Sequence, residues 1–172
     1  MKAKRGLACG LLLVFAAAGL RAQPASFEAK VGHVSDGDTL WALPLRGGGA
    51  ERVRIVGIDA PELCQAAGSE ARDALAAVLA HEQVRVIAQG HDDFGRTLAR
   101  IELRGQDIGA RLVREGHAWS YRFRSDPGPY LREERLAHRG HLGLWRDAHP
   151  MEPRVFRRRH GPCTGDTSAA GS

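Results

Sequence analysis

Hydrophobic and polar residues alternate along three consecutive stretches in the first third of the chain, at 27–34, 39–45 and 51–58. Alternation with a period of two is typical of strands that bury one face. Ser35-Asp36-Gly37-Asp38 separates the first two stretches, and Asp-Gly is a strong signal for a hairpin turn. A glycine-rich connection at 46–50 leads into the third stretch. The pattern therefore predicts three strands in succession.

A helical period follows the third stretch. Gly68-Ser69 opens a segment whose apolar residues recur at helical spacing: Ala71, Leu75, Val78 and Leu79. The remaining pattern predicts two more strands and two more helices, at 83–88, 96–103, 108–115 and 129–139. Strands in a row, followed by helices, indicate an α+β fold on a small antiparallel sheet. Five strands of this length predict a Greek-key barrel of the OB type with three helices.

The two ends of the chain lie outside this pattern. The basic segment 2–5 and the short apolar run 7–18 are typical of a cleavable export signal, which we expect to cover residues 1–22. An uncleaved N-terminal anchor is the alternative. Residues 148–172 are predicted to form an irregular, basic and partly disordered tail, and a phosphate-binding arm formed by the arginines at 154 and 157–159 is the alternative. One folded domain then remains, at 27–147.

Removal of the signal would change both the charge and the cysteine count. The full chain has 25 basic and 20 acidic residues, a formal charge of +5, and four of the basic residues lie in 1–22. The mature charge is therefore 21 against 20, or +1, so affinity for a polyanion must come from local basic clusters. Cys64 and Cys163 remain once Cys9 is removed. An even pair in an exported protein suggests one disulfide, with two free thiols as the alternative.

One arginine interrupts the third predicted strand. Arg54 lies in an apolar run, where a charge is unfavourable unless an anion meets it. That anion is either a carboxylate of the chain, such as Asp59 or Glu62, or a phosphate from outside. Asp59 and Glu62 lie where the strand gives way to a loop, a usual place for site residues held by a rigid scaffold.

The acidic residues around this strand match the ligands of a hard cation. Asp38 and Asp59 supply two carboxylates if the hairpin and the end of the third strand lie side by side. The carbonyl of Ala60 adds a third ligand and water the rest, an oxygen set that Ca²⁺ prefers. The alternative is local turn chemistry, in which these aspartates bond nearby backbone N–H groups.

A further carboxylate and two guanidinium groups complete the set. Glu62 has no evident role as a cap or turn former, so it is a candidate general base for a water molecule beside the cation. Arg54 and Arg96 suit a phosphodiester, because a guanidinium can bind two phosphate oxygens and stabilise the charge of a transition state. For Arg96 the alternative is an ion pair with Asp92 or Asp93 in its own hairpin.

Three separated motifs resemble the thermonuclease, or staphylococcal-nuclease-like, family: Asp36-Gly37-Asp38-Thr39, Val53-Arg54-Ile55-Val56-Gly57-Ile58-Asp59-Ala60-Pro61-Glu62 and Asp92-Asp93-Phe94-Gly95-Arg96. The resemblance covers residues 27–145. It implies an OB-fold barrel with three helices, and a calcium-dependent nuclease that acts on DNA and RNA and leaves 3′-phosphates. By position it also implies three roles: calcium binding by Asp38, Asp59 and the Ala60 carbonyl, phosphate binding by Arg54 and Arg96, and general-base catalysis by Glu62.

The chain departs from the best-known members of that family at a few positions. Ala60 replaces a threonine, but only the backbone carbonyl is needed there. Asp93 and Phe94 replace a lysine and a tyrosine that help to hold terminal phosphates, so the resemblance does not determine substrate affinity or preference. Tyr121 stands near a base-stacking tyrosine of the family, and packing on the third helix is the alternative.

The sequence thus predicts an exported, calcium-dependent, sugar-nonspecific nuclease, periplasmic or secreted. DNA and RNA are the expected substrates, and we expect a monomer with no stable protein partner and no membrane contact after signal cleavage. The rival is a catalytically inactive OB-fold module that binds nucleic acid or protein, since OB folds often only bind. The complete set of ionisable side chains favours the enzyme.

Overall fold

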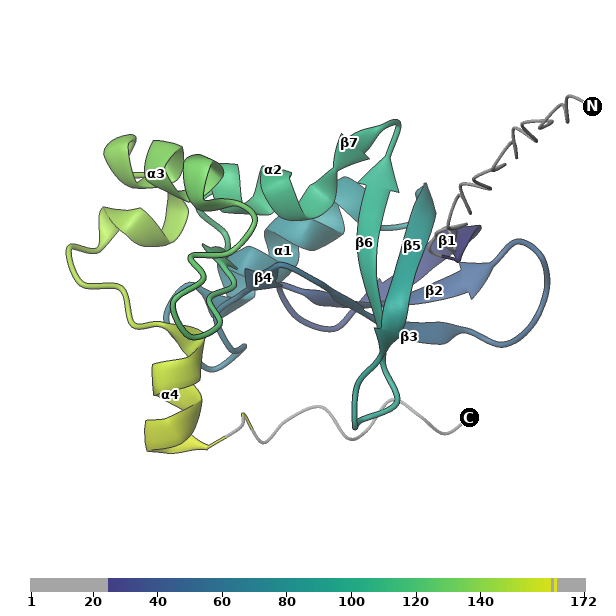
Figure 1. Ribbon diagram of the computed structural model, residues 1–172, viewed down its shortest axis with the longest axis horizontal. Coiled ribbons are helices and arrows are strands. Elements are labelled where there is room, and N and C mark those ends of the chain that lie inside the picture. Colours follow the sequence, from purple (N-terminus) through teal and green to yellow (C-terminus); the bar gives the residue numbers. More distant parts are fainter. Residues whose placement is uncertain (1–24, 162, 164–172) are drawn as a thin grey trace, which may run out of the picture.

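The alternating stretches of the sequence form a closed β-barrel (Figure 1). Its five strands are β1 (Ser26–Val34), β2 (Thr39–Pro44), β3 (Glu51–Ile55), β5 (Gln83–His91) and β6 (Thr97–Leu103). They lie in the order β3-β2-β1-β5-β6, and a parallel pairing of β3 with β6 closes the barrel. The other neighbouring pairs are antiparallel. The predicted α+β fold with an OB-type barrel is therefore confirmed.

The computed structural model describes residues 25–161 and 163. The predicted signal at 1–22 and the last residues of the chain lie outside this part. Among the described residues, no helix combines the length and the apolar character that crossing a bilayer requires.

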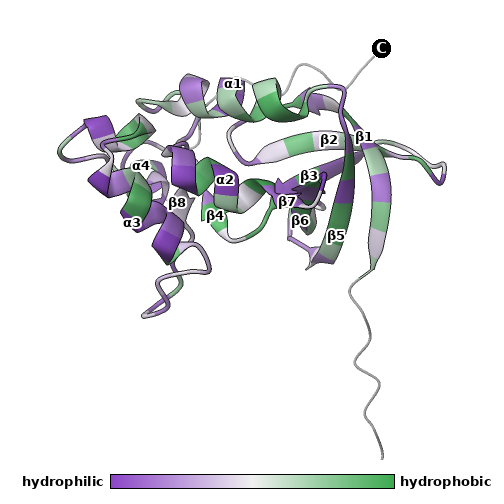
Figure 2. Cartoon of the chain, turned by 90° about the horizontal axis from the view of Figure 1, so that it is seen from above, coloured by the Kyte–Doolittle hydropathy of each residue, from purple (hydrophilic) through white to green (hydrophobic). Residues whose placement is uncertain are grey.

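Alternate residues of the strands fill the barrel. Apolar and polar residues follow one another along β1 in Figure 2. The inward set is fully buried and includes Val31, Leu40, Val53, Val86 and Ile101. Helices α1 (Gly68–Leu79) and α2 (Ile108–Glu115) bury their apolar faces in the same core cluster. Burial of each such side chain contributes roughly 1.5–3 kcal/mol.

The third strand is shorter than its alternation predicts, because the chain bends sharply at Gly57. This residue has φ +80°, a left-handed conformation that ends β3 at Ile55. After the bend, the short strand β4 (Ile58–Asp59) pairs with β8 (Trp119–Ser120) instead of continuing beside β2. The bend thus carries Asp59 away from the ladder of β3 while keeping it buried.

Three helices lie where the sequence predicts them. After α1 and α2, the third is α3 (Leu131–Arg139), and a 3₁₀ turn at Gly143–Arg146 follows it. A two-residue strand, β7 (Gln106–Asp107), leads into α2, and the Asp107 side chain caps that helix. The helices gather on one side of the barrel (Figure 1).

The prediction of an irregular C-terminal tail was wrong for part of its length. A fourth helix, α4, occupies Pro153–His160. Pro153 lies in its first turn, where the missing N–H has no helical partner to lose. The last four of its eight residues are three arginines and a histidine. Positive charge is favourable at this end of a helix. The high charge of this segment favoured the prediction of a disordered tail, although the proline was a signal for the start of a helix.

Candidate active site

A cavity of about 540 Å³ opens at the end of β3. Three acidic residues and four arginines line it: Asp36, Asp38, Glu62, Arg52, Arg54, Arg96 and Arg157. Exposed aromatic rings stand at its border, with Phe94 81% and Tyr121 43% accessible. The cavity therefore combines anionic groups, cationic groups and flat apolar surfaces in one place.

Asp38 joins the β1–β2 hairpin to the end of β3. Its backbone carbonyl accepts a hydrogen bond from the Ile55 amide at 2.8 Å. Its carboxylate accepts the Ala60 amide at 3.0 Å and the Thr39 hydroxyl at 3.1 Å. Asp36 supports the same loop by accepting the Asp38 amide at 3.0 Å. The hairpin and the strand end thus lie side by side, which is the arrangement that a shared cation site requires.

Arg54 bridges two of the acidic residues. Its Nη1 lies 2.8 Å from an Asp38 oxygen and its Nη2 3.5 Å from an Asp59 oxygen. It also donates to the backbone carbonyls of Ile55, at the end of β3, and Ile58, in β4. The side chain is only 15% accessible, so the guanidinium is fixed in direction. Of the carboxylates that the sequence suggested, Asp59 contacts Arg54, whereas the main partner is Asp38.

The acidic residues are placed where ionisation is unfavourable without more positive charge. Burial, with the neighbouring charge of Asp38, raises the pKa of Asp36 to about 7. Burial also raises the pKa of Asp59, although the ion pairs with Arg157 and Arg54 oppose this shift. A bound cation would relieve both effects.

The donor set around this acidic cluster fits a hard cation. The available ligands are oxygen atoms alone, from Asp38, Asp59 and the Ala60 backbone, which suits Ca²⁺ or another hard ion. Among the described residues, no group of three or more acidic, histidine or cysteine side chains forms a complete metal site. Carbonyl and water ligands would therefore have to complete the shell.

Arg96 enters the cavity from the β5–β6 turn. Its Nε lies 2.7 Å from an Asp92 oxygen, and Asp92 also accepts the backbone amides of Arg96 and Phe94. Burial alone would raise the pKa of Asp92, but these hydrogen bonds outweigh it and the pKa is lowered. The guanidinium of Arg96 lies 5.5 Å from the centre of the Phe94 ring. The ion pair with Asp92, which the sequence offered as the alternative for Arg96, is thus present, and Arg96 also lines the cavity.

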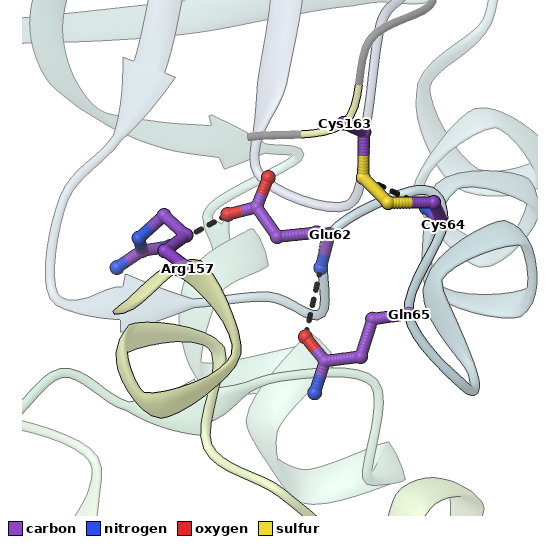
Figure 3. The surroundings of a disulfide bond; sticks show 5 residues. All are labelled: Glu62, Cys64, Gln65, Arg157 and Cys163. Carbon is purple, nitrogen blue, oxygen red and sulfur yellow. Dashed lines mark hydrogen bonds and ion pairs between the residues drawn. A yellow bond between two sulfur atoms is a disulfide. The ribbon is translucent and has the colours of Figure 1, made fainter. Parts of the chain in front are cut away.

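Glu62 meets an arginine from the far end of the sequence. Arg157 of α4 places Nη1 2.7 Å from Glu62 Oε1 and 3.2 Å from Asp59 Oδ1, as the side chains in Figure 3 illustrate for Glu62. Its Nη2 lies 3.3 Å from the second Asp59 oxygen. Burial works against the charge of Arg157, but these two carboxylates outweigh it and raise its pKa. The sequence did not predict this residue as part of the site.

A disulfide ties the C-terminal segment to the loop that carries Glu62. Cys64 and Cys163 are bonded, with their Cα atoms 5.7 Å apart (Figure 3). In the same loop, Gln65 accepts the Glu62 amide at 3.2 Å and donates to the Met151 carbonyl at 2.5 Å. The predicted cysteine pairing is thus present in the structure. It places the bridge two residues after Glu62.

Tyr121 borders the cavity rather than packing beneath the third helix. Its amide donates to the Gly57 carbonyl at 2.8 Å, which holds β8 beside the bend. The buried tyrosine of this region is Tyr130, whose hydroxyl donates to Asp107 at 3.0 Å. Tyr121 is left with an accessible ring at the edge of the site.

Comparison with known proteins accounts for this combination of barrel and cavity. The family model of staphylococcal nuclease homologues matches residues 52–147. An "uncharacterized endonuclease" of Haemophilus influenzae is 37% identical over 130 residues, covering 76% of this chain and 72% of the relative. A "micrococcal nuclease" of Shigella flexneri is 39% identical over 145 residues, covering 78% of this chain and 82% of the relative. The chain belongs to the staphylococcal nuclease family.

Membership confirms the resemblance that the three sequence motifs suggested. As a staphylococcal nuclease homologue, the chain is a hydrolase that acts on phosphodiester bonds, and its substrates are nucleic acids. The family is generally dependent on a metal ion. The matched region ends at Asp147, so α4, Arg157 and Cys163 lie beyond it.

Proposed function

We propose that this staphylococcal nuclease homologue is an exported, calcium-dependent enzyme that cleaves both DNA and RNA and leaves 3′-phosphates. The observation that carries the proposal is the convergence of Asp38 and Asp59 on one guanidinium, that of Arg54, at 2.8 and 3.5 Å. Two carboxylates and a guanidinium group that can bind a phosphate therefore lie next to one another in the cavity.

Each residue has a role that follows from its chemistry. Asp38, Asp59 and the Ala60 carbonyl would hold Ca²⁺, which when bound supplies positive charge beside the phosphate oxygens. Arg54 and Arg96 bind the scissile phosphate and stabilise the negative charge that grows on it. Their aspartate partners hold both guanidinium groups in place before substrate arrives.

Glu62 is the proposed general base. It accepts a proton from a water molecule whose oxygen attacks phosphorus, while the bond from phosphorus to the 5′ oxygen breaks. The leaving oxygen takes a proton from solvent and becomes a 5′-hydroxyl, and the phosphate remains on the 3′ side. Tyr121 offers its exposed ring to a base of the substrate.

Export is supported by two features of the chain. The basic and apolar segments within 1–22 have the composition of a cleavable signal. The Cys64–Cys163 bridge joins cysteines that would stay reduced in most cytosolic proteins. We expect the mature protein in the periplasm or outside the cell, as a monomer.

Cleavage assays with controlled metal test this proposal. The mature protein should degrade single-stranded DNA and RNA with Ca²⁺, lose activity in a chelator, and give 3′-phosphate ends by mass spectrometry. Equal activity without Ca²⁺, or none at any concentration, would refute calcium dependence. Products with 5′-phosphate ends would refute the proposal that the bond from phosphorus to the 5′ oxygen breaks.

The role of Glu62 has its own test. Glu62→Gln should lower turnover by about 10²–10⁴-fold, the usual contribution of a general base. Glu28→Gln is the matched control, because Glu28 is exposed on β1 and does not line the cavity. Circular dichroism should be the same for both variants. Unchanged turnover in Glu62→Gln would remove this residue from the mechanism.

A further inference from the structure

Helix α4 brings a fourth arginine to the cavity, beside Arg52, Arg54 and Arg96. Arg157 lies against the two carboxylates closest to the proposed chemistry, Asp59 and Glu62, at 2.7–3.3 Å. The family match ends at residue 147. Arg157 therefore lies outside the region that the family model matches.

The guanidinium of Arg157 is only partly occupied by these contacts. An arginine has five N–H donors in a flat fork. Within the described part of the chain, the hydrogen bonds of Arg157 use its two terminal nitrogens and leave Nε without a partner. Its side chain is 39% accessible, against 15% for Arg54. Arg157 therefore has both donors and open space facing the cavity.

The helix that carries Arg157 is anchored on both sides. Before α4, the Met151 carbonyl accepts from Gln65 at 2.5 Å and Glu152 pairs with Arg122 at 3.3 Å. After α4, Cys163 is bonded to Cys64. The hydrogen bond from Gln65 and the disulfide to Cys64 both connect to the loop of Glu62, so α4 is fixed relative to the site. Pre-organised groups of this kind bind a substrate with little further loss of entropy.

A second arginine of α4 continues the same surface. Arg154 is three residues before Arg157, so both lie on one face of the helix. Arg154 lines a neighbouring cavity of about 130 Å³, together with Arg122 and Arg124. Tyr121 lines both cavities. A nucleic-acid strand that runs from one cavity to the other thus passes along α4.

We infer that Arg157 is a substrate-binding residue, a third guanidinium for the phosphodiester in the cavity, and that α4 is part of the nucleic-acid site. In the free enzyme Arg157 is paired with Asp59 and Glu62. Binding of a cation by Asp59 and of water by Glu62 would leave Arg157 free for a phosphate, which offers the same two-oxygen geometry as a carboxylate. This inference rests on the proposed roles of Asp59 and Glu62.

Arginine variants on α4 separate this role from a structural one. Arg157→Ala should lower kcat/KM by about 10–100-fold, the loss expected for a hydrogen bond to a charged group. Arg157→Lys should recover part of the loss, since a lysine keeps the charge without the fork. Arg158→Ala is the matched control, because this neighbour has the same charge, is exposed, and lines neither cavity. It should leave kcat/KM unchanged.

Two further measurements identify the ligand of Arg157. Binding of a labelled single-stranded oligonucleotide is measured with Ca²⁺ in a Glu62→Gln background, which prevents cleavage. Adding Arg157→Ala should remove about 0.7 from the slope of log K against log salt, the value for one phosphate contact on a single strand. A gel run after the titration verifies that the oligonucleotide is intact. Titration of Ca²⁺ by calorimetry should show that Arg157→Ala binds the ion at least as tightly as wild type, because Arg157 pairs with Asp59 in the free enzyme. A loss of kcat/KM in this variant then does not come from a loss of Ca²⁺.

The outcomes are distinct. An unchanged kcat/KM and salt slope in Arg157→Ala, with active wild type, would overturn the inference and leave the proposed function intact. Higher activity together with tighter Ca²⁺ binding would also overturn it, because Arg157 would then be an inhibitory block. A wild-type protein without calcium-dependent cleavage would instead refute the proposed function. Thermal melting of each variant checks that the fold is retained.

Discussion

The bend at Gly57 determines where Asp59 lies, and it can be tested by adding a single methyl group. Gly57 has φ +80°, and a Cβ built there would lie 2.8 Å from Pro129 Cγ and 2.9 Å from Tyr130 Cε2. Tyr130 cannot move aside freely, because it is buried and its hydroxyl is hydrogen-bonded to Asp107. Gly57→Ala therefore combines backbone strain with a close contact.

The two effects can be separated with a second glycine. Gly105 has φ +79°, but a Cβ there would meet nothing within 4 Å. Gly105→Ala should therefore cost only the left-handed backbone, ~1–2 kcal/mol. Gly57→Ala should cost a further ~1–3 kcal/mol for overpacking. Replacing glycine by alanine also restricts the unfolded chain, which stabilises the folded state by ~0.4–1 kcal/mol. This effect is the same in both variants and cancels in their difference.

Urea denaturation followed by tryptophan fluorescence measures these free energies of unfolding. We expect Gly57→Ala to be less stable than Gly105→Ala by ~1–3 kcal/mol, with equal m-values. It should also lower kcat/KM under native conditions, because Asp59 follows the bend by two residues, whereas Gly105→Ala should not. Equal stabilities for the two variants would refute the close packing of the bend against Pro129 and Tyr130.

Two further predictions concern buried charge and the disulfide. Burial raises the pKa of Glu134, although the Ser120 amide and Arg122 oppose the shift. The contribution of Glu134 to stability should then fall as the pH rises above 4.5, because the unfolded state releases this proton first. The free energy of unfolding of Glu134→Gln, measured by urea titration, should rise relative to that of wild type as the pH increases. A fall of this difference with increasing pH would contradict the prediction. Thiol titration of denatured, unreduced mature protein should find no reactive thiol, since Cys64 and Cys163 are bridged across 99 residues. Reduction should cost ~2–5 kcal/mol of stability, and two reactive thiols before reduction would disprove the bridge.

Much of the barrel and its acidic edge could be predicted because the signals are local. Period-two alternation locates the strands of the barrel, and the Asp-Gly hairpin locates Asp38. The end of β3 was misjudged because alternation continues through Gly57 although the backbone turns there. The conformation of that glycine depends on Pro129 and Tyr130, which are more than 70 residues away. No short segment of the sequence contains both Gly57 and the two residues that pack against it.

The same distinction explains why Arg157 was missed. Arg96 and its partner Asp92 are four residues apart, so their pairing can be considered from the sequence. Arg157 and Glu62 are 95 residues apart, and only the fold brings them together. Pro153 at the start of the segment and Gly161 after it were the available signals for a helix. They show where α4 begins and ends but give no information on what its arginines contact.

The structure also removes a choice that the sequence posed for each arginine, between an ion pair within the chain and a phosphate from outside. Arg54 pairs with Asp38 and Asp59, and Arg96 pairs with Asp92, while both line the cavity. A carboxylate and a phosphate present similar pairs of oxygens, so under the proposed function an aspartate that orients a guanidinium in the free enzyme would also prepare it for the substrate. In that function the ion pairs would hold these side chains in position for a phosphate. For a charged side chain as buried as that of Arg54, such a partner is also what makes burial tolerable.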